Sequence, residues 1–435
     1  MRRIRRFSLG GGPGSSLWAA PLLCVAAAVV IHRLFWWFDG RTRWAWLGFS
    51  PEGARAVVGA ITSSLLTFMV FTFSILLLVV QIAGSQLSPR IIQFAMRNRF
   101  VRFAMGVFVF SFTYSLLVLS RIEDRVPQLP MTMVVVSCFV SIGVFLYLVN
   151  LMARSLRPAG ILSTIAAGGV QVIEDMYPRP LAVSAVEPPE QAGPVLTGTP
   201  RTVYYRQASG VLQAVDGPRL AELAQRNRCT IRLAPQIGDF VTRGEPLFHI
   251  YDGGQSIDDH ELYQAVAVGP EHTLEQDPRF AFRIMVDIAS KALSPAINDP
   301  STAVLALDQI QRLLRLVGKR YLGDGTIRDT EGVVRVIVPT PNWEDFVSLG
   351  MSEIRLFGAN SIQVVRRLRA MIETLIAVLP ERRHPALQEQ SGLLDRTIER
   401  SFPDPVDRAY AGISDIQGMG SSRGDHSAGG SAQEG

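Results

Sequence analysis

The sequence contains little cysteine and little lysine, and it lacks the common short motifs of enzymes. Its 435 residues include 3 cysteines, two in apolar runs (Cys24 and Cys138) and one far away in the polar part (Cys229), so the sequence suggests no disulfide framework. There is no phosphate-binding loop, no HExxH or GxSxG motif and no CxxC pair. We therefore expect a protein that is not an enzyme, with no catalytic residues, no metal and no cofactor.

Lys291 and Lys319 are the only lysines, so nearly all of the 43 basic residues are arginines. The formal net charge of +5 reflects this arginine-rich composition. No recognition helix, zinc finger or base-stacking pattern accompanies the charge, and we expect no nucleic-acid partner.

Long apolar runs crowd the first third of the chain. They are Leu17–Phe38, Val57–Ala83, Val101–Leu119 and Met131–Met152. Each has about the 20 residues with which a helix crosses about 30 Å of hydrocarbon, so four transmembrane helices in a lipid bilayer are predicted. His32 and Arg33 interrupt the first run near its end, and we expect both to extend toward the interface.

Arginines lie unevenly around these runs. The N-terminal arm and the connection between the second and third runs contain arginines and no acidic residue. In the connection between the third and fourth runs, Glu123 and Asp124 offset Arg121 and Arg125. Because basic loops stay inside, the N-terminus and the C-terminal domain are predicted to be cytoplasmic, in a multi-pass protein of the bacterial cytoplasmic (inner) membrane.

Composition divides the chain into successive segments. They are a cytoplasmic N-terminal arm (1–16), a four-span transmembrane domain (17–153), a coupling helix (154–177), a linker (178–200), a small β-module (201–256), a mainly helical cytosolic domain (257–410) and a disordered tail (411–435). The predicted fold class is an α-helical membrane domain with four transmembrane helices, followed by a mixed α+β cytosolic domain with a small β-module.

The soluble part shows short strands followed by helices. Strands are predicted at Thr202–Arg206, Gly210–Val215, Thr230–Leu233 and Pro246–Tyr251, and helices at Pro218–Asn227, Arg279–Leu293, Thr302–Val317 and, as one helix or two, Trp343–Leu379. The segment Gly238–Leu247 resembles the turn of lipoyl and biotinyl domains but lacks their modified lysine. A lone β-rich run, Val333–Val338, lies among the helices, and Gly168 and Gly169 weaken the coupling helix.

Two sets of motifs resemble a bacterial family of predicted membrane proteins catalogued as domain of unknown function 2254. The first set reads Gln276-Asp277-Pro278-Arg279-Phe280, then Val286-Asp287-Ile288-Ala289 and Ala292 to Ala303 (ALSPAINDPSTA). The second is Gln81 to Arg90 (QIAGSQLSPR) at the end of the second span. The resemblance implies four spans and a cytosolic domain, and it brings no established activity.

Polar residues align along one side of the second apolar run. They are Ser63, Thr67, Ser74, Gln81 and Ser85. At about 100° per residue they fall within an arc of about 40°. The stripe has two interpretations, close packing between helices of the four-helix domain or the lining of a pore in a homo-oligomer.

A polar turn in the soluble part is the other candidate site. Its residues are Ser294, Pro295, Asn298, Asp299, Pro300 and Thr302. Either Asn298 or Asp299 binds a cation with the help of Asp287, or Asp299 caps the helix that begins at Pro300, and a role of the turn in oligomer contact is also open. The group Asp258-Asp259-His260-Glu261, with His272 and Glu275 downstream, has metal-capable side chains but also suits an acidic helix N-terminus.

Two hypotheses for the function follow. One is a homo-oligomeric channel for a small ion or solute. The other is a membrane-anchored regulatory or scaffold protein whose cytosolic domain binds a ligand or protein. No acidic side chain lies inside the second, third or fourth span, and Arg102 at the start of the third is the one basic residue in them, which argues against a carrier built on buried carboxylates.

Overall fold

A computed structural model describes residues 19–39, 41, 48, 50–82, 99–122, 126–155, 157–181, 196 and 198–420. The chain forms two compact units, Ser8–Gly160 and Ile161–Gly435. Met1–Phe7, Ser85 and the residues after Gly420 lie outside the described part, as does most of the predicted linker.

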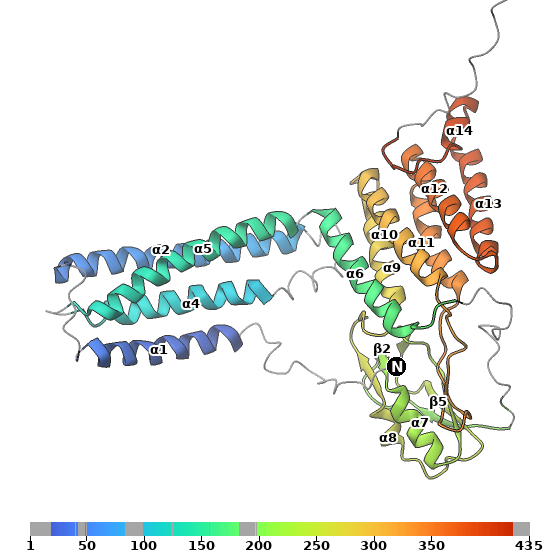
Figure 1. Ribbon diagram of the computed structural model, residues 1–435, viewed down its shortest axis with the longest axis horizontal. Coiled ribbons are helices and arrows are strands. Elements are labelled where there is room, and N and C mark those ends of the chain that lie inside the picture. The colour runs from blue at the N-terminus through green and yellow to red at the C-terminus, as the bar shows by residue number, and fades with distance from the viewer. Residues whose placement is uncertain are drawn as a thin grey trace, which may run out of the picture. The chain divides into compact units, whose positions relative to one another are not determined.

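The first unit consists of helices that run side by side (Figure 1). They are α1 (Ala19–Asp39), α2 (Pro51–Ile82), α4 (Arg99–Leu119) and α5 (Gln128–Ser155). All four are long and apolar enough to cross a membrane, as the apolar runs predicted. The α4 and α5 helices each pack against the other three, and α1 and α2 make their largest contacts with α4.

Two apolar clusters and a pair of polar contacts fix this unit. One cluster surrounds Tyr114 and Met131, and the other surrounds Phe108 and Leu148. At the end where α4 stops, Arg55 Nε of α2 donates to the carbonyl of Ile122 at 2.8 Å. At the start of α5, the backbone N–H of Leu129 donates to Oδ1 of Asp39, the last residue of α1, at 2.9 Å. The first bond ties α2 to the segment that follows α4, and the second ties α5 to α1.

The second unit contains two sheets. The strands are β1 (Arg201–Tyr204), β2 (Gly210–Val215), β3 (Thr230–Leu233), β4 (Phe240–Val241), β5 (Pro246–Tyr251), β6 (Val266–Gly269), β7 (Thr326–Arg328) and β8 (Val334–Ile337). One sheet has the order β1-β5-β3-β8-β7 and the other β4-β2-β6. All pairs are antiparallel except β3 with β8, which are parallel. Leu212, Ile231 and Phe248 are fully enclosed in the core of this region.

The β-module does not end at residue 256, where composition placed its boundary. The β6 strand pairs with β2, and β8 pairs with β3 about a hundred residues earlier in the chain. The run predicted as a lone strand is therefore an internal strand of a sheet. Without β8 and β6, the backbone groups of β3 and β2 on one side would have no sheet partner.

Helices make up the rest of the second unit. They are α6 (Pro158–Met176), α7 (Gly217–Arg226), α8 (Asp259–Tyr263), α9 (Pro278–Ala292), α10 (Pro300–Gly318), α11 (Trp343–Phe357), α12 (Ile362–Val378), α13 (His384–Ser401) and α14 (Pro405–Ala411). The predicted helix Trp343–Leu379 is two helices, because the chain turns between Gly358 and Ser361.

The predicted tail begins too early at residue 411. Asp415 is 3% exposed, and its carboxylate accepts hydrogen bonds from the N–H groups of Gln417, Gly418 and Gly420. Arg366 donates from Nε to the carbonyl of Ile413 at 3.0 Å. These bonds hold residues 411–420 against α12, and composition alone did not indicate them.

Candidate functional site

The polar stripe of α2 lies on the outer surface of the first unit. Ser63, Thr67, Ser74 and Gln81 are all exposed, and Ser85 falls outside the described residues. The opposite side of the helix packs inward through Val58 and Leu65, both fully buried. The structure thus does not place the stripe between helices of the same unit, and contact with a second copy or with water remains a prediction.

Most hydroxyl groups on the outside of α2 bond to their own helix. Thr67 Oγ1 donates to the Ser63 carbonyl at 3.0 Å, and Ser74 Oγ donates to the Val70 carbonyl at 2.9 Å. Ser64, which is off the stripe, bonds to the Ala60 carbonyl at 2.8 Å. Ser63 Oγ differs, because it has no hydrogen-bond partner in the described part of the chain. It is therefore the stripe hydroxyl that most needs a partner from outside the unit.

A second set of serines, which the sequence did not single out, lies inside the unit. Ser111 and Ser115 of α4 face Ser137 and Ser141 of α5, and all four are at most 5% exposed. Ser141 Oγ donates to Ser111 Oγ at 3.0 Å, and Ser115 Oγ donates to the Ser111 carbonyl at 2.7 Å. The spacing of four residues on two adjacent spans was the signal that could have revealed them. This seam holds α4 against α5.

His32 is also enclosed in this unit. Its ring is 3% exposed and packs on Trp36 and Tyr114, with centroids 5.9 and 5.8 Å away. Among the described residues, neither ring nitrogen of His32 nor the Tyr114 hydroxyl has a hydrogen-bond partner. The prediction that His32 extends to the interface is wrong, since the ring turns into the core, whereas Arg33 is exposed as expected.

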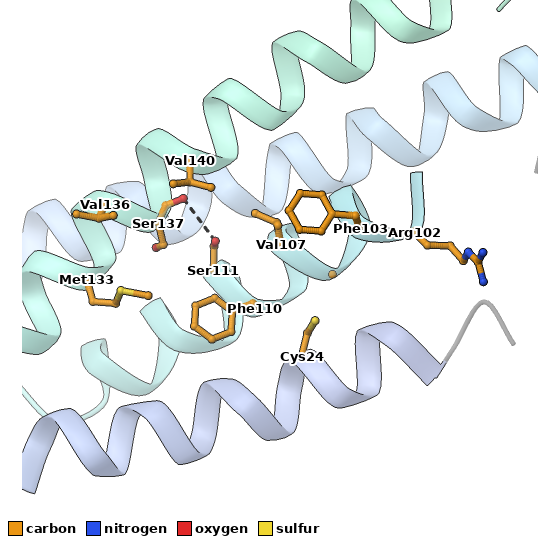
Figure 2. A pocket seen from close by; sticks show the side chains of 11 residues that line it. Cys24, Arg102, Phe103, Val107, Phe110, Ser111, Met133, Val136, Ser137 and Val140 are labelled. Carbon is orange, nitrogen blue, oxygen red and sulfur yellow. Dashed lines mark hydrogen bonds between the residues drawn. The ribbon is translucent and has the colours of Figure 1, made fainter. Parts of the chain in front are cut away.

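An apolar groove opens on the side of the unit formed by α1, α4 and α5 (Figure 2). Its volume is about 510 Å³, and its walls are mostly apolar, for example Phe103, Phe110 and Val140. Arg102 lies at one end on α4, and Met133 of α5 lies toward the other. No α2 residue is among the described residues that line it. The groove and the polar stripe therefore occupy different faces.

The signature turn of the second unit forms a helix cap. Asp299 Oδ1 accepts from the Thr302 N–H at 3.1 Å, and Oδ2 accepts from the Thr302 hydroxyl at 2.5 Å. Pro300 is the first residue of α10, so the capping interpretation is confirmed. Ser294 Oγ donates to the Lys291 carbonyl at 2.7 Å, and the left-handed φ of 48° at Asn298 makes the turn. Pro295 and Asn298 are exposed.

Asp287 does not join this turn as a cation ligand. It accepts from Arg283 Nε at 2.6 Å, and the same guanidinium contacts Glu353 of α11 at 2.8 Å. The hydrogen bond from Arg283 lowers the pKa of Glu353. The network joins α9 to α11.

The motif around Asp277 joins the sheets to the helices. The Gln276 amide bonds to both backbone groups of Val215, at 3.0 and 3.3 Å. Asp277 caps α9, and Arg279 donates to the Ile237 carbonyl at 2.7 Å. Burial raises the pKa of Asp277, and the neighbouring Arg279 opposes that shift. The motif is thus explained by structural contacts.

The acidic group near residue 260 is also structural. Asp258 caps α8 by accepting from the His260 N–H at 3.0 Å, and Asp259 pairs with Arg201 at 2.5 Å. This is the acidic helix N-terminus that was one of the two interpretations. Within the described residues, no three His, Cys, Asp or Glu side chains gather as a metal site requires.

Buried arginines are a feature of the helical part that the sequence did not indicate. Arg366 and Arg383 donate to backbone carbonyls and lie over the rings of Tyr410 and Trp343. Arg355 is 8% exposed and donates to Thr397 Oγ1 at 2.8 Å. Burial lowers the pKa of Arg355, and Arg400 and Arg396 lower it further.

Comparison with known proteins gives relatives over most of the chain. A family described as predicted membrane protein (DUF2254) matches residues 14–374. Uncharacterized proteins of Mycobacterium bovis and Mycobacterium tuberculosis are each 31% identical over 424 residues, which covers 92% of this chain and 76% of the relative. No solved structure matches the chain.

Proposed function

The chain belongs to the predicted membrane protein family DUF2254, and on that premise we propose that it assembles through α2 into a homo-oligomer that conducts small ions or solutes. The observation that carries the proposal is the exposed hydroxyl of Ser63 on the polar stripe, for which the described residues provide no hydrogen-bond partner. In hydrocarbon a polar group without a partner is unfavourable, so contact with water or a second copy would stabilise it.

The interior of one unit offers less support for conduction. Its serines bond to one another and to backbone carbonyls, and they are closed off from solvent. A path would then run between copies, lined by the outer face of α2, with Thr67 and Ser74 on the same side as Ser63.

We also propose the orientation that the arginines indicate, in the bacterial inner membrane with the N-terminus and the second unit in the cytoplasm. Reporter fusions after Arg157 should then report cytoplasm, and fusions near Pro127 should report the exterior. An exterior signal after Arg157 would contradict this orientation.

Adjacent serines provide the test of conduction. Ser63 and Ser64 are both exposed, lie at the same depth and differ by about 100° around the helix. Because α2 begins at Pro51, both also lie nearer its middle than Ser74 does. In a background without Cys24 and Cys138, a polar thiol reagent should modify the Ser63→Cys variant in liposomes much faster than the Ser64→Cys variant. Thr72→Cys, at a buried position, is the unreactive reference.

Flux measurements complete the test. Liposomes containing the purified protein should pass small ions, Ser63→Leu should reduce that flux, and Ser64→Leu should leave it unchanged, because only the first makes the path apolar. Equal reactivity of the two cysteines in liposomes that stay tight would contradict the proposal. A membrane-anchored regulatory or scaffold protein would then be the better hypothesis.

A further inference from the structure

The apolar groove of the first unit extends from one end of α4 past the middle of that helix. Nine residues of α4 separate Arg102 from Ser111, which is about 14 Å at 1.5 Å per residue. The hydrocarbon core is about 30 Å thick, so one leaflet takes about half of that. In a spanning helix, a groove that starts at Arg102 would reach roughly the middle of the membrane near Ser111 and Ser137, and its lining continues about one turn farther, to Met133.

The groove is built from three helices rather than from one surface. Gly106 of α4 lies so close to α1 that a Cβ there would meet Cys24 Sγ at 2.9 Å. On the other wall, Val140 of α5 is 47% exposed. Figure 2 shows Cys24 on α1 opposite the α4 and α5 side chains. The floor and walls are thus apolar, as an acyl chain requires.

Charge distinguishes the two ends of the groove. Arg102 lies in the first turn of α4, near the start of the candidate span, where a long arginine side chain can reach the headgroup region. It is the charged residue among the described residues that line the groove, and none of those is acidic. Arginine binds phosphate through several N–H groups at once, and basic residues between spans attract anionic headgroups.

We propose that this groove binds one phospholipid with an anionic headgroup, with its phosphate at Arg102 and an acyl chain along Phe103, Val107 and Val140. The volume of about 510 Å³ falls within the roughly 300–1,000 Å³ of ligand sites. Because α2 contributes nothing to the groove, the site is independent of assembly through the polar stripe.

Lipid binding can be measured through the native cysteines, because a lipid in the groove should protect Cys24 from alkylation. Cys24 lines the groove, whereas Cys138 of α5 is outside the lining and serves as the control in the same molecule. The full-length protein in detergent is treated with a small maleimide, and alkylation at each cysteine is followed by mass spectrometry. Phosphatidylglycerol should slow alkylation of Cys24 but not of Cys138. Phosphatidylcholine with the same chains should need about a fivefold higher concentration for the same protection, since it lacks the net charge.

Matched variants separate the headgroup from the chain. Arg102→Gln should remove the difference between the two lipids, and Arg121→Gln, at the other end of α4, should keep it. Val140→Phe, which fills the groove, should abolish protection by lipid, whereas Val149→Phe, exposed on the same helix outside the lining, should not.

Other outcomes would overturn the proposal. Equal protection by both lipids in the unmodified protein would exclude recognition of the headgroup. Protection by inorganic phosphate alone would exclude the acyl chain as part of the ligand. Protection that depends on protein concentration rather than on lipid would indicate a second copy in the groove.

Discussion

Gly168 and Gly169 of α6 should respond in opposite directions to the same substitution. Gly168 is half-buried, and a Cβ there would lie 3.4 Å from Leu274 Cδ1, which is ordinary contact. A Cβ at Gly169 would lie 2.9 Å from both Ala281 Cβ of α9 and Leu313 Cδ1 of α10. Leu313 can rotate, but Ala281 can move only with its backbone.

The two effects have different sizes. Replacing a helical glycine by alanine gains about 0.5–1 kcal/mol of helix stability. Overpacking a core costs about 1–3 kcal/mol, and because a Cβ at Gly169 would clash on two sides we take about 2–2.5 kcal/mol, so Gly169→Ala should lose about 1–2 kcal/mol in net. We expect amide hydrogen exchange in α6 of the full-length protein to slow about two- to fivefold in Gly168→Ala and to accelerate about five- to thirtyfold in Gly169→Ala.

The pair contains its own control, because both variants have the same composition and differ by one position. Exchange in β3 and β5, which are distant from α6 in the same unit, should change little in Gly168→Ala. If Gly169→Ala is as stable as Gly168→Ala, then α6 does not pack on α9 and α10 as closely as the structure indicates.

Three further substitutions test two aspartates that cap helices, Asp299 and Asp277. Asp299→Ala should destabilise α10 by about 0.5–2 kcal/mol because the cap is lost, and Asp299→Asn should have a smaller effect. Amide hydrogen exchange in α10 measures both effects. A metal-dependent stabilisation that is lost in the Asn variant would contradict capping. The pKa of Asp277 is raised above its ordinary 3.8, so its proton is held more tightly in the folded state. The raised pKa of Asp277 contributes to the stability of the folded protein fully below pH 3.8, and this contribution is lost as the pH rises through the folded pKa. Asp277→Asn should therefore gain stability relative to the unmodified protein between acidic and neutral pH. If the melting temperatures of the two proteins change in parallel across that range, the raised pKa of Asp277 is refuted.

The elements of this fold were predictable where their signals are local. The four apolar runs, the strands at residues 201–251 and the aspartate-then-proline start of α10 all agree with the structure within a few residues. A cap bonds to an N–H three residues away, and an apolar run needs no partner to be recognised.

What depends on distant partners was not predictable. The pairing of β3 with β8 joins Ile231 to Val336, and no pattern near either residue indicates the other. The seam of Ser111 and Ser141 and the enclosure of His32 depend on how helices rotate against each other. Periodicity locates a polar stripe on α2, but it does not tell whether that side faces the bundle or its surroundings.

The serine hydroxyls on the outer face of α2 are not equally informative about what that face contacts. A serine bonded to the carbonyl four residues earlier, such as Ser64 or Ser74, already has its hydrogen bond and can face lipid at little cost. Their exposure is therefore weak evidence for water or for a second copy. Ser63 is one position from Ser64 and is also exposed, but among the described residues it lacks that bond. Cysteine variants at the two positions have the same side chain at nearly the same depth. A difference in their reactivity must therefore come from what each side of α2 faces. Comparing Ser63 with Ser64 thus tests the proposal more directly than the exposure of the whole stripe does.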